Sequence, residues 1–434
     1  MLKLIKANQK NFLSKLDLIL QKRKIQNPKI DLIVKNIIND IKKNKDVALI
    51  KYEKKFSKQK NISIKNIKFS TLEKNKIIKR LDKKTKASID LAFNRIFNFH
   101  KKQKLFSYSY KDKFKNLFAY KSTALKKVGV YVPGGRASYP SSVLMNCIPA
   151  LVAGVKEIYM TTPTMTKFYN PAVIYAAQKC GVKEIYKIGG SQAIAAMTYG
   201  TKTVQKVDKI VGPGNSFVAS AKKQVFGDVG IDMIAGPSEV TIVADKFSKP
   251  EWIAADLIAQ AEHDETSQSI ILSDDIKIIK KINYFLLQQL KTLPKKSIAS
   301  KSLKNFGLSI LFTNKKLLTD IINLIAPEHL EIFTKNAEKI LRNVQNAGSI
   351  FLGEYSPEAV GDYLAGPNHV LPTSGSARFS SGLSVYDFLK RHSVIKMTKT
   401  GIERLGASVI NLAKYENLEG HANSIKIRLQ KRKK

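Results

Sequence analysis

The hydrophobic positions divide the chain into regions of different pattern. In residues 1–120, apolar residues recur three and four positions apart among many Lys and Asn residues, as in the run from Leu32 to Ile38. This spacing is the period of an amphipathic helix. We therefore expect a helical, Lys-rich N-terminal region that carries little chemistry.

Beyond Val128 the pattern changes to short apolar runs, each followed by a turn and a helical stretch. The four pairs of run and turn are KKVGVYV with PGG, KEIYM with TTP, KEIYKI with GGSQ, and DKIV with GPGN. A repeated strand–turn–helix pattern predicts a parallel α/β sheet. Its turns follow the carboxyl ends of the strands, where such sheets bind ligands.

A second block of strands and helices follows. VTIVAD and SQSIILSD are predicted strands, and Ser248 and Glu251 form a possible S-x-x-E capping box that opens the helix WIAADLIAQAEHDE. Residues 276–350 alternate Lys-rich helices with short strands such as LSILFT. We expect the tail from about Tyr386 to be helical again.

Composition limits the class of protein. Of the 434 residues, 44% are hydrophobic and 25% are charged, which is ordinary for a folded chain and excludes a disordered one. The 2 cysteines cannot form a disulfide framework and suit a reducing cytoplasm. No apolar run approaches the ~18 residues of a membrane helix, and the N-terminus lacks signal-peptide features, so we expect a cytoplasmic protein without a membrane segment.

The net charge is unusual. Lys and Arg number 75 against 34 Asp and Glu, which gives +41. A nucleic-acid partner would explain this excess, and so would compositional drift, because Lys, Ile and Asn all have A/T-rich codons. The sequence has neither an aromatic RNA-binding signature nor zinc-finger spacing, so we favour a solvated Lys coat over a nucleic-acid surface.

Three turns are candidate anion sites. YVPGG begins at Tyr131, GGSQ ends at Gln192, and GPGN ends at Asn215. Each can present main-chain N–H groups at the start of a helix, although none is a G-x-G-x-x-G or Walker motif. One such turn is an ordinary helix cap, whereas three in successive units favour a ligand cleft.

Four polar residues suggest a metal site. Gln260 and His263 lie three apart in a predicted helix and share one face, which a polar helix edge also explains. Asp362 lies in the Gly-bracketed loop GDYLAGPNHV and His421 in LEGHANS. A donor set without Cys is typical of catalytic rather than structural zinc, but spacing alone does not join these four.

The segment APEHLE contains candidate acid/base residues. Pro327 suits a first helical turn, so His329 would lie near a helix N-terminus, where the dipole favours the neutral imidazole of a general base. Glu328 beside it could activate water. An ordinary helix opening accounts for the same residues. Cys147 and Cys180 lie in apolar settings and are expected to be buried.

Taken together, these segments resemble the histidinol dehydrogenase family. The similar motifs occur in the family's order over residues 128–425: YVPGG, PSSVLM, GGSQAIAAM, VDKIVGPGN, GIDMIAGPSEV, LIAQAEHD, APEHLE, GDYLAGPNHVLPT, SGLSVYDF and EGHANS. The resemblance implies oxidation of L-histidinol through L-histidinal to L-histidine with two NAD⁺, the last steps of histidine biosynthesis. It also implies one zinc per subunit and a homodimer.

The resemblance also implies roles for individual residues. Its acid/base pair falls on Glu328 and His329, and its zinc ligands fall on Gln260, His263, Asp362 and His421. Its NAD contacts fall on Tyr131, Gln192 and Asn215. Its substrate contacts fall on Ser238, Gln260, His263, His329, Asp362, Glu416 and His421. Arg136, Cys147 and Ser191 are less usual for the family and lie near the expected cofactor cleft.

The implied fold is α/β, with two incomplete Rossmann-like domains of aldehyde dehydrogenase type and small helical N- and C-terminal dimerisation segments. Residues 1–26 would form the N-terminal segment, and 27–130 with 239–384 a larger α/β domain. Residues 131–238 would form an inserted cofactor-binding domain, and 385–434 a dimerisation tail that carries Glu416 and His421 into the partner's site.

Two alternatives remain at this point. An aldehyde dehydrogenase-like enzyme would use a Cys thiohemiacetal, for which Cys147 is the only candidate, although its surroundings in the sequence offer no activating base. A Lys-rich nucleic-acid binder would instead show salt-dependent DNA binding.

Overall fold

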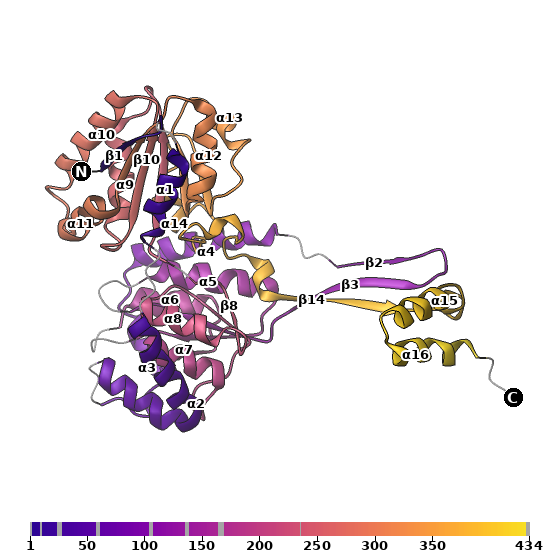
Figure 1. The fold of residues 1–434 in the computed structure, drawn as a ribbon. Coiled ribbons are helices and arrows are strands. Elements are labelled where there is room, and N and C mark those ends of the chain that lie inside the picture. The colour runs from indigo at the N-terminus through magenta and orange to yellow at the C-terminus, as the bar shows by residue number, and fades with distance from the viewer. Residues whose placement is uncertain are drawn as a thin grey trace. The chain divides into compact units, whose positions relative to one another are not determined.

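The computed structural model describes residues 2–8, 11–23, 28–57, 61–103, 107–134, 139–163, 169–234 and 236–430. The chain forms two compact units, each built from separate parts of the sequence (Figure 1). The first unit comprises residues 1–102 and 126–388, and the second comprises 103–125 and 389–434.

The first unit contains a parallel six-stranded sheet, in the order β1-β11-β10-β9-β12-β13. Its strands are β1 (Lys3–Lys6), β9 (Glu239–Ala244), β10 (Gln268–Ser273), β11 (Leu308–Leu311), β12 (His329–Ile332) and β13 (Ser349–Leu352). All residues of β9 and β10 are buried, because strands in the middle of a parallel sheet are covered on both faces. The two strands predicted from VTIVAD and SQSIILSD are therefore confirmed.

Helices cover both faces of this sheet. Val240 and Ile242 pack with the helices on one face, α9 (Pro250–Ala261), α10 (Ile276–Gln289) and α11 (Lys296–Phe306). Val243 packs on the other face with α1 (Phe12–Gln21) and α12 (Lys315–Ile325). This alternation follows from the two-residue period of a strand. The short helices α13 (Ala337–Leu341) and α14 (Glu358–Tyr363) complete this part of the unit.

A second parallel sheet in the same unit has the order β6-β5-β4-β7-β8. Its strands are β4 (Lys127–Tyr131), β5 (Glu157–Thr161), β6 (Glu184–Tyr186), β7 (Lys209–Val211) and β8 (Gly230–Ile231). The helices between them are α5 (Pro140–Ala153), α6 (Pro171–Lys179), α7 (Gly190–Tyr199) and α8 (Ser216–Val225). The repeated strand–turn–helix pattern thus correctly predicted a parallel α/β sheet.

The N-terminal helices pack against the helices of this second sheet. Helix α2 (Pro28–Phe56) contacts α7 and α8, α3 (Thr71–Ile78) contacts α6, and α4 (Lys83–Lys101) contacts α5. These contacts group residues 28–101 with the five-stranded sheet, whereas the sequence analysis grouped residues 27–130 with 239–384. The helical prediction for residues 1–120 is confirmed for α1 to α4, but strands β1 and β2 (Tyr108–Lys111) and the first half of β3 (Leu117–Ala124) also lie in this range.

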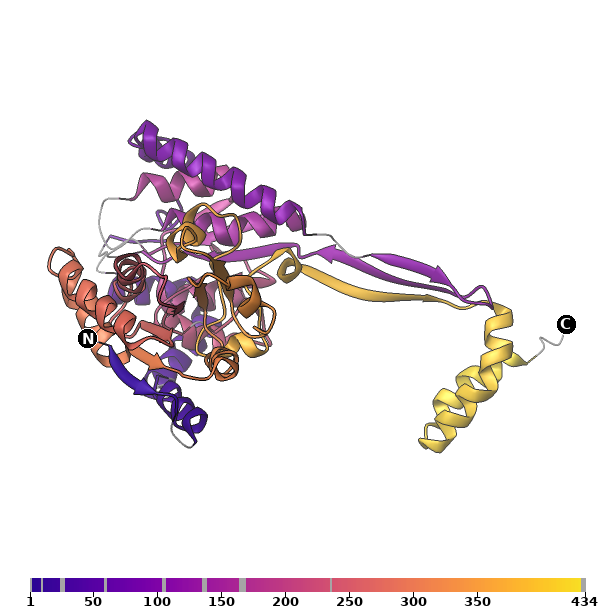
Figure 2. The same cartoon turned by 90° about the horizontal axis from the view of Figure 1, so that it is seen from above.

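The second unit combines an antiparallel sheet with two helices. Its strands are β2 (Tyr108–Lys111), β3 (Leu117–Ala124) and β14 (Leu389–Lys396), in the order β14-β3-β2. Helices α15 (Lys399–Tyr415) and α16 (Glu419–Leu429) pack against each other (Figure 2). The tail therefore has a short 3-10 helix, η2 (Val385–Phe388), and then the strand β14 before its two α-helices. Local periodicity does not reveal β14, because it pairs with a segment some 270 positions earlier.

The predicted capping box at the start of α9 is wrong. The helix begins at Pro250, and its N-cap residue is Lys249, which makes no side-chain cap. Ser248 Oγ instead accepts a hydrogen bond from the Asp245 N–H at 3.0 Å, within the turn after β9. Pro at the first helical position starts the helix without that cap, since its φ is already helical and it has no N–H to satisfy.

The described helices include no candidate for a membrane-spanning segment. None of the helices in the described ranges combines the length and the apolar character that a bilayer span needs.

One buried carboxylate on α2 holds the turn between β6 and α7. Glu53 Oε1 accepts hydrogen bonds from the Gly189 N–H and from Gln192 Nε2, both at 2.8 Å. Burial raises the pKa of Glu53 to about 7, although both donors act in the opposite direction. Because the folded state holds this proton more tightly than the unfolded chain does, stability falls as the pH rises between about 4.5 and 7.

We predict that Glu53→Gln removes this pH dependence. The Gln oxygen still accepts both hydrogen bonds but does not titrate, so the variant should avoid a loss of about 3 kcal/mol between pH 4.5 and pH 8. Urea unfolding of both proteins at several pH values measures the difference. The matched control Glu251→Gln, at an exposed carboxylate, should behave as wild type. An equal pH dependence in Glu53→Gln and wild type would show that the assigned titration is wrong.

Candidate active site

The candidate site lies in the first unit, at the amino ends of strands β9 and β12. Gln260 is on the last turn of α9, and His263 follows the end of that helix, where its N–H donates to the Gln260 carbonyl at 3.3 Å. Gln260 is fully buried and His263 is exposed. The two residues are therefore close, as the i, i+3 spacing predicted, but His263 lies just beyond the helix.

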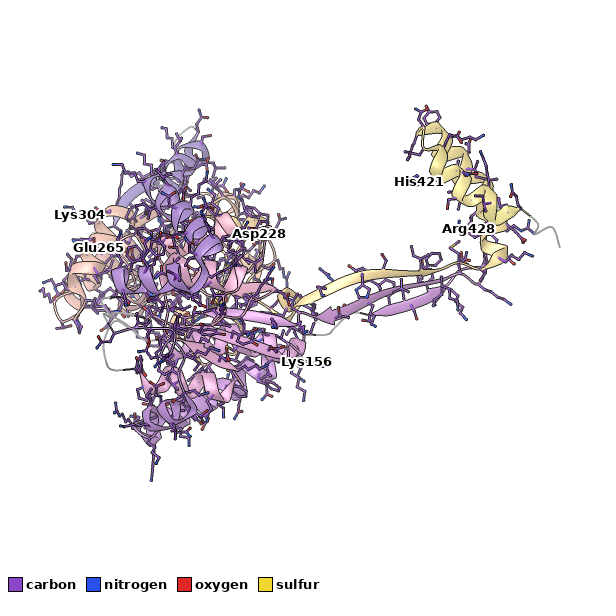
Figure 3. All side chains as sticks on the ribbon, turned by 90° about the horizontal axis from the view of Figure 1, so that it is seen from below. Lys156, Asp228, Glu265, Lys304, His421 and Arg428 are labelled. Carbon is purple, nitrogen blue, oxygen red and sulfur yellow. The ribbon has the colours of Figure 1, made fainter. Side chains whose placement is uncertain are left out.

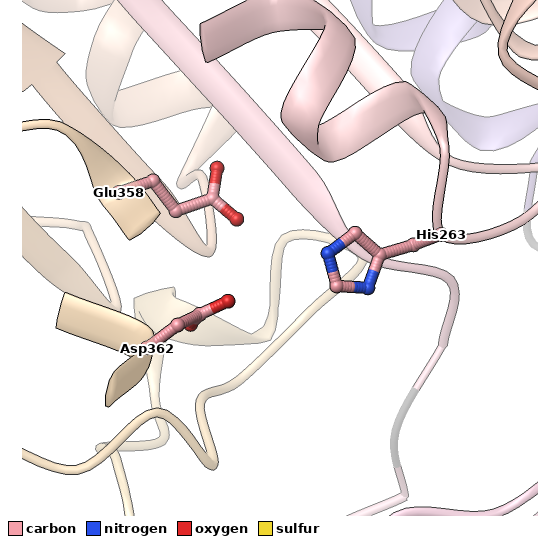
Figure 4. Close-up of side chains that lie close together, drawn as sticks. All are labelled: His263, Glu358 and Asp362. Atoms are coloured by element: carbon pink, nitrogen blue, oxygen red, sulfur yellow. The ribbon is translucent and has the colours of Figure 1, made fainter. Parts of the chain in front are cut away.

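Three side chains converge as a group that could hold a metal ion. The ligand atoms of His263, Glu358 and Asp362 all lie within 4.8 Å of one another (Figure 4). Glu358 and Asp362 lie on one face of α14 because they are four positions apart. The sequence analysis selected Asp362 and missed Glu358. The signal for Glu358 was a second acidic residue one helical turn before the first.

His329 is the first residue of β12, and its tautomer follows from its partner. The ring Nδ1 lies 3.0 Å from the Glu239 carbonyl oxygen, which only accepts, so Nδ1 carries the proton and Nε2 has the lone pair. Nε2 lies 4.0 Å from Asp362 Oδ1. Burial lowers the pKa of His329, so its imidazole is neutral at neutral pH.

The predicted helix start at Pro327 is wrong. Helix α12 ends at Ile325, and Ala326 has the left-handed φ of +47° that terminates many helices. Pro327 therefore follows a helix end and leads into β12. The expected neutral imidazole of His329 is supported, but burial rather than a helix dipole causes it.

Glu328 is buried beside His329. Its Oε2 accepts a hydrogen bond from the Glu239 N–H at 2.7 Å and lies 3.8 Å from His329 Nδ1. Burial, and then the charge of Glu239, raise the pKa of Glu328 well above its usual range. Such a carboxylate has a strong affinity for a proton, as a general base requires.

The site contains more buried carboxyl groups than nearby positively charged side chains. Burial and the charge of Asp362 raise the pKa of Glu358, and the Glu358 N–H donates to Glu331 Oε1 at 2.6 Å. Among the described residues, the buried atoms here that lack a hydrogen-bond partner include Gln260 Oε1, His329 Nε2 and Glu358 Oε2. Buried polar groups normally have partners, so these atoms indicate a missing ligand. Imidazole, carboxylate and amide donors suit a divalent cation such as zinc.

His369 holds the main chain of one of the converging acidic residues. Its Nδ1 lies 3.0 Å from the Asp362 carbonyl oxygen and 3.6 Å from Asp362 Oδ1. Residues that hold a ligand's orientation are typical of metal sites. His329, Asp362 and His369 line a cavity of about 240 Å³ together with apolar side chains such as Phe351. The sequence analysis assigned no role to His369.

The remaining predicted substrate residues are in different places. Ser238 directly precedes Glu239 at the start of β9, and its carbonyl accepts from the Gln268 N–H at 3.0 Å. Glu416 caps the end of α15, and His421 is exposed on α16, both in the second unit (Figure 3). The first unit thus brings together Gln260, His263, Asp362, Glu328 and His329.

The predicted NAD contacts lie at the carboxyl ends of strands of the second sheet or in the helices that follow them. The Tyr131 hydroxyl accepts from the Gly190 N–H at 3.1 Å, and burial raises its pKa to about 12. Gln192 donates to Glu53, as described above. Asn215 caps α8 by accepting from two N–H groups, those of Phe217 and Val218. These bonds explain the residues structurally, and their contacts with NAD stay a prediction.

The sequence analysis named three residues as less usual for the family and close to the expected cofactor cleft. Arg136 lies outside the described residues, and Ser191 is buried on α7. Cys147 is fully buried, and a hydrogen bond with Cys180, together with burial, raises the pKa of its thiol well above the usual range. A nucleophilic thiolate needs the opposite shift, which argues against a thiohemiacetal mechanism.

Comparison with known proteins gives a consistent result. The sequence model of the family described as Histidinol dehydrogenase matches residues 20–429. Histidinol dehydrogenase from Pelagibacter ubique is 54% identical over 100% of both chains, and histidinol dehydrogenase 1 from Nostoc sp. is 45% identical over 98% of both. The crystal structure of histidinol dehydrogenase from Elizabethkingia anophelis has a TM-score of 0.92 and 39% identity, covering 99% of this chain and 98% of that one.

Proposed function

This chain belongs to the histidinol dehydrogenase family, and we propose from that membership and its site that it oxidises L-histidinol through L-histidinal to L-histidine. Two NAD⁺ serve as acceptors, in the last steps of histidine biosynthesis in the cytoplasm. The observation that carries the proposal is the buried, neutral His329 beside Glu328 and a cluster of metal-binding groups.

His329 is the base for both oxidations. Each one removes a proton and a hydride, and His329 Nε2 is the ring atom that is free to accept the proton. The hydrogen bond from Nδ1 to the Glu239 carbonyl fixes the tautomer and the ring plane. Substitution at this position therefore affects the alcohol and the aldehyde steps alike.

Glu328 acts between the two oxidations. The aldehyde must add water before a second hydride leaves, and a carboxylate of raised pKa accepts a proton from that water. Glu328 follows α12 and His329 begins β12, so successive side chains point in different directions and can address two positions around one carbon.

Gln260, His263 and Asp362 would hold one zinc ion, with His421 as the fourth ligand. The unpartnered, buried Gln260 Oε1 and the nitrogen and oxygen donor set support this assignment. When bound, zinc acts as a Lewis acid that orients the substrate, whose imidazole and amine nitrogens are suitable ligands. Glu358 supplies additional negative charge beside His263 and Asp362.

Tyr131, Gln192 and Asn215 would bind NAD⁺, which supplies the hydride acceptor. Tyr131 is the last residue of β4, Gln192 lies in the first turn of α7, and Asn215 is the N-cap of α8, so all three lie at the carboxyl edge of the five-stranded sheet. That edge is the usual nucleotide position in parallel α/β sheets, which supports the assignment. A cavity of about 240 Å³ beside His329 gives a small imidazole alcohol room to bind.

The family resemblance also supports a homodimer in which Glu416 and His421 complete the partner's site. Both lie in the second unit, which is formed by chain segments separate from the rest of the site residues. The most direct test of the whole proposal is NAD⁺ reduction with histidinol, with and without a zinc chelator. No reduction by zinc-loaded protein would refute it.

We predict that His263→Ala lowers both bound zinc and activity by at least about tenfold. Loss of one ligand leaves too few donors to retain the ion. Metal analysis and NADH formation measure the two effects. The control His392→Ala, at an exposed position on β14, should keep both. Full activity in metal-stripped wild-type protein would contradict a role for zinc.

We predict that Glu328→Gln and His329→Asn slow different steps of the reaction. Glu328→Gln should slow histidinal oxidation by about tenfold or more while sparing histidinol oxidation to the aldehyde, because only the second step needs activated water. His329→Asn should slow both steps. Single-turnover rates with each substrate separate them. An equal loss on both substrates in Glu328→Gln would show that its assigned role is wrong.

We predict that two inactive variants, His263→Ala and His421→Ala, complement each other. If His421 serves the partner's site, a mixed dimer has one doubly altered and one intact site. Co-refolding equal amounts should then restore up to roughly a quarter of wild-type activity if pairing is random. Absence of recovery in proven mixed dimers would mean that His421 serves its own chain.

A further inference from the structure

Arg23, which follows helix α1, is buried against the first residues of strands β9 and β10. Its Nη1 donates to Glu239 Oε1 at 2.7 Å and to Gln268 Oε1 at 2.9 Å. Its Nη2 donates to the carbonyl oxygens of Pro237 and Thr266, at 3.2 Å and 3.1 Å. The side chains of Arg23 and Glu239 are 4% and 6% exposed. One planar guanidinium therefore fixes a carboxylate and the start of both strands.

Glu239 in turn holds both reactive side chains through its main chain. Its N–H donates to Glu328 Oε2, and its carbonyl oxygen accepts from His329 Nδ1. The first register pair between β9 and β12 joins Val240 to His329. Glu239 thus lies just before the first residue of β9 that pairs with β12, and its main-chain groups bond to the Glu328 and His329 side chains instead. Any displacement of Glu239 moves both reactive groups together.

The side chain of Glu239 has a second anchor. Its Oε1 also accepts from the Ser374 N–H at 3.0 Å, so the carboxylate is held between Arg23 and a loop that follows the site residues of α14. Among the described residues, no hydrogen bond joins Arg23 to His263, Glu358 or Asp362. Its hydrogen bonds therefore reach Glu328 and His329 through Glu239, and its charge also acts on Glu328, opposing the rise that burial causes in the pKa of that carboxyl.

We propose that the buried Arg23–Glu239 ion pair positions Glu328 and His329 for oxidation, so that Arg23 is a positioning residue for the reaction. The inference rests on the proposed function. It predicts a specific pattern of kinetic change, because a small displacement of a proton acceptor slows chemistry more than it weakens substrate binding.

The first test is Arg23→Ala in the full-length, zinc-loaded protein with histidinol and NAD⁺. We expect kcat to fall by about tenfold or more while KM for histidinol stays within about threefold and the zinc content is unchanged. Arg23→Lys keeps the charge but not the four hydrogen bonds, and should lose less. The matched control is Arg378→Ala, since Arg378 lines the same cavity as Arg23 but is exposed, and among the described residues it donates a hydrogen bond to the Gly375 carbonyl. It should stay within about twofold of wild type.

Chemical rescue separates positioning from a general loss of structure. Arg23, Glu239 and Gln268 line a cavity of about 150 Å³, which truncation of Arg23 would enlarge enough to admit guanidinium ion. Millimolar guanidinium should raise kcat of Arg23→Ala by at least about threefold, whereas equal NaCl should not, and Arg23→Lys should not respond.

Each outcome decides the inference. Wild-type kcat in Arg23→Ala would overturn it while the proposed function stands. A loss of kcat that accompanies loss of zinc and that guanidinium does not rescue would assign Arg23 a purely structural role, and this also overturns it. If Arg23→Ala is insoluble, Arg23→Lys replaces it in the test. A lower kcat with unchanged KM and zinc content then supports the inference, and a wild-type kcat overturns it. Wild-type protein that does not oxidise histidinol would refute the proposed function and this inference together.

Discussion

The burial of like charges around one point is the constraint on which this site depends. Glu328 and Glu358 are buried and lie close to Asp362 and His329, in a region where ionised carboxylates repel one another strongly. Such a group is stable only if protons or a cation balance it. The elements that carry it, β12, α14 and the end of α9, bring these groups close enough together to bind one cation, and the acid/base pair proposed above belongs to the same cluster of charges.

Much of this fold follows from local pattern. Apolar runs joined to short turns predict four strands of the second sheet correctly, β4 to β7, because each unit is completed within about forty residues, whereas the two-residue strand β8 was not predicted. Two local signals misled, at Ser248 and at Pro327. At Ser248 the hydroxyl is taken by the turn after β9, and Pro327 lies just beyond the C-cap of α12 and leads into β12. A capping motif in the sequence does not show whether its residues belong to the start of the helix or to the element before it.

The candidate site was predicted mainly from the order of the motifs, because its residues come from segments that lie far apart in the chain. Gln260 and His329 are 69 positions apart, and Arg23 and Glu239 are 216 positions apart. No periodicity connects such pairs. Glu358 was missed because its pairing with His263 depends on how α14 packs near α9, and Arg23 because a single Arg in a Lys-rich segment has no distinguishing pattern.

The pairing of β14 with β3 has a consequence for synthesis of the protein. Residues 117–124 leave the ribosome long before residues 389–396, which are their partners over the whole length of β14. Until then β2 and β3 can form only a two-stranded hairpin, which is marginally stable on its own. The unit that carries Glu416 and His421 is thus completed last, after the rest of the chain has been made. A nascent chain therefore holds an unfinished exposed sheet edge for most of its synthesis, and the charged residues on these strands, such as Lys111 and Lys121, protect it from wrong pairing.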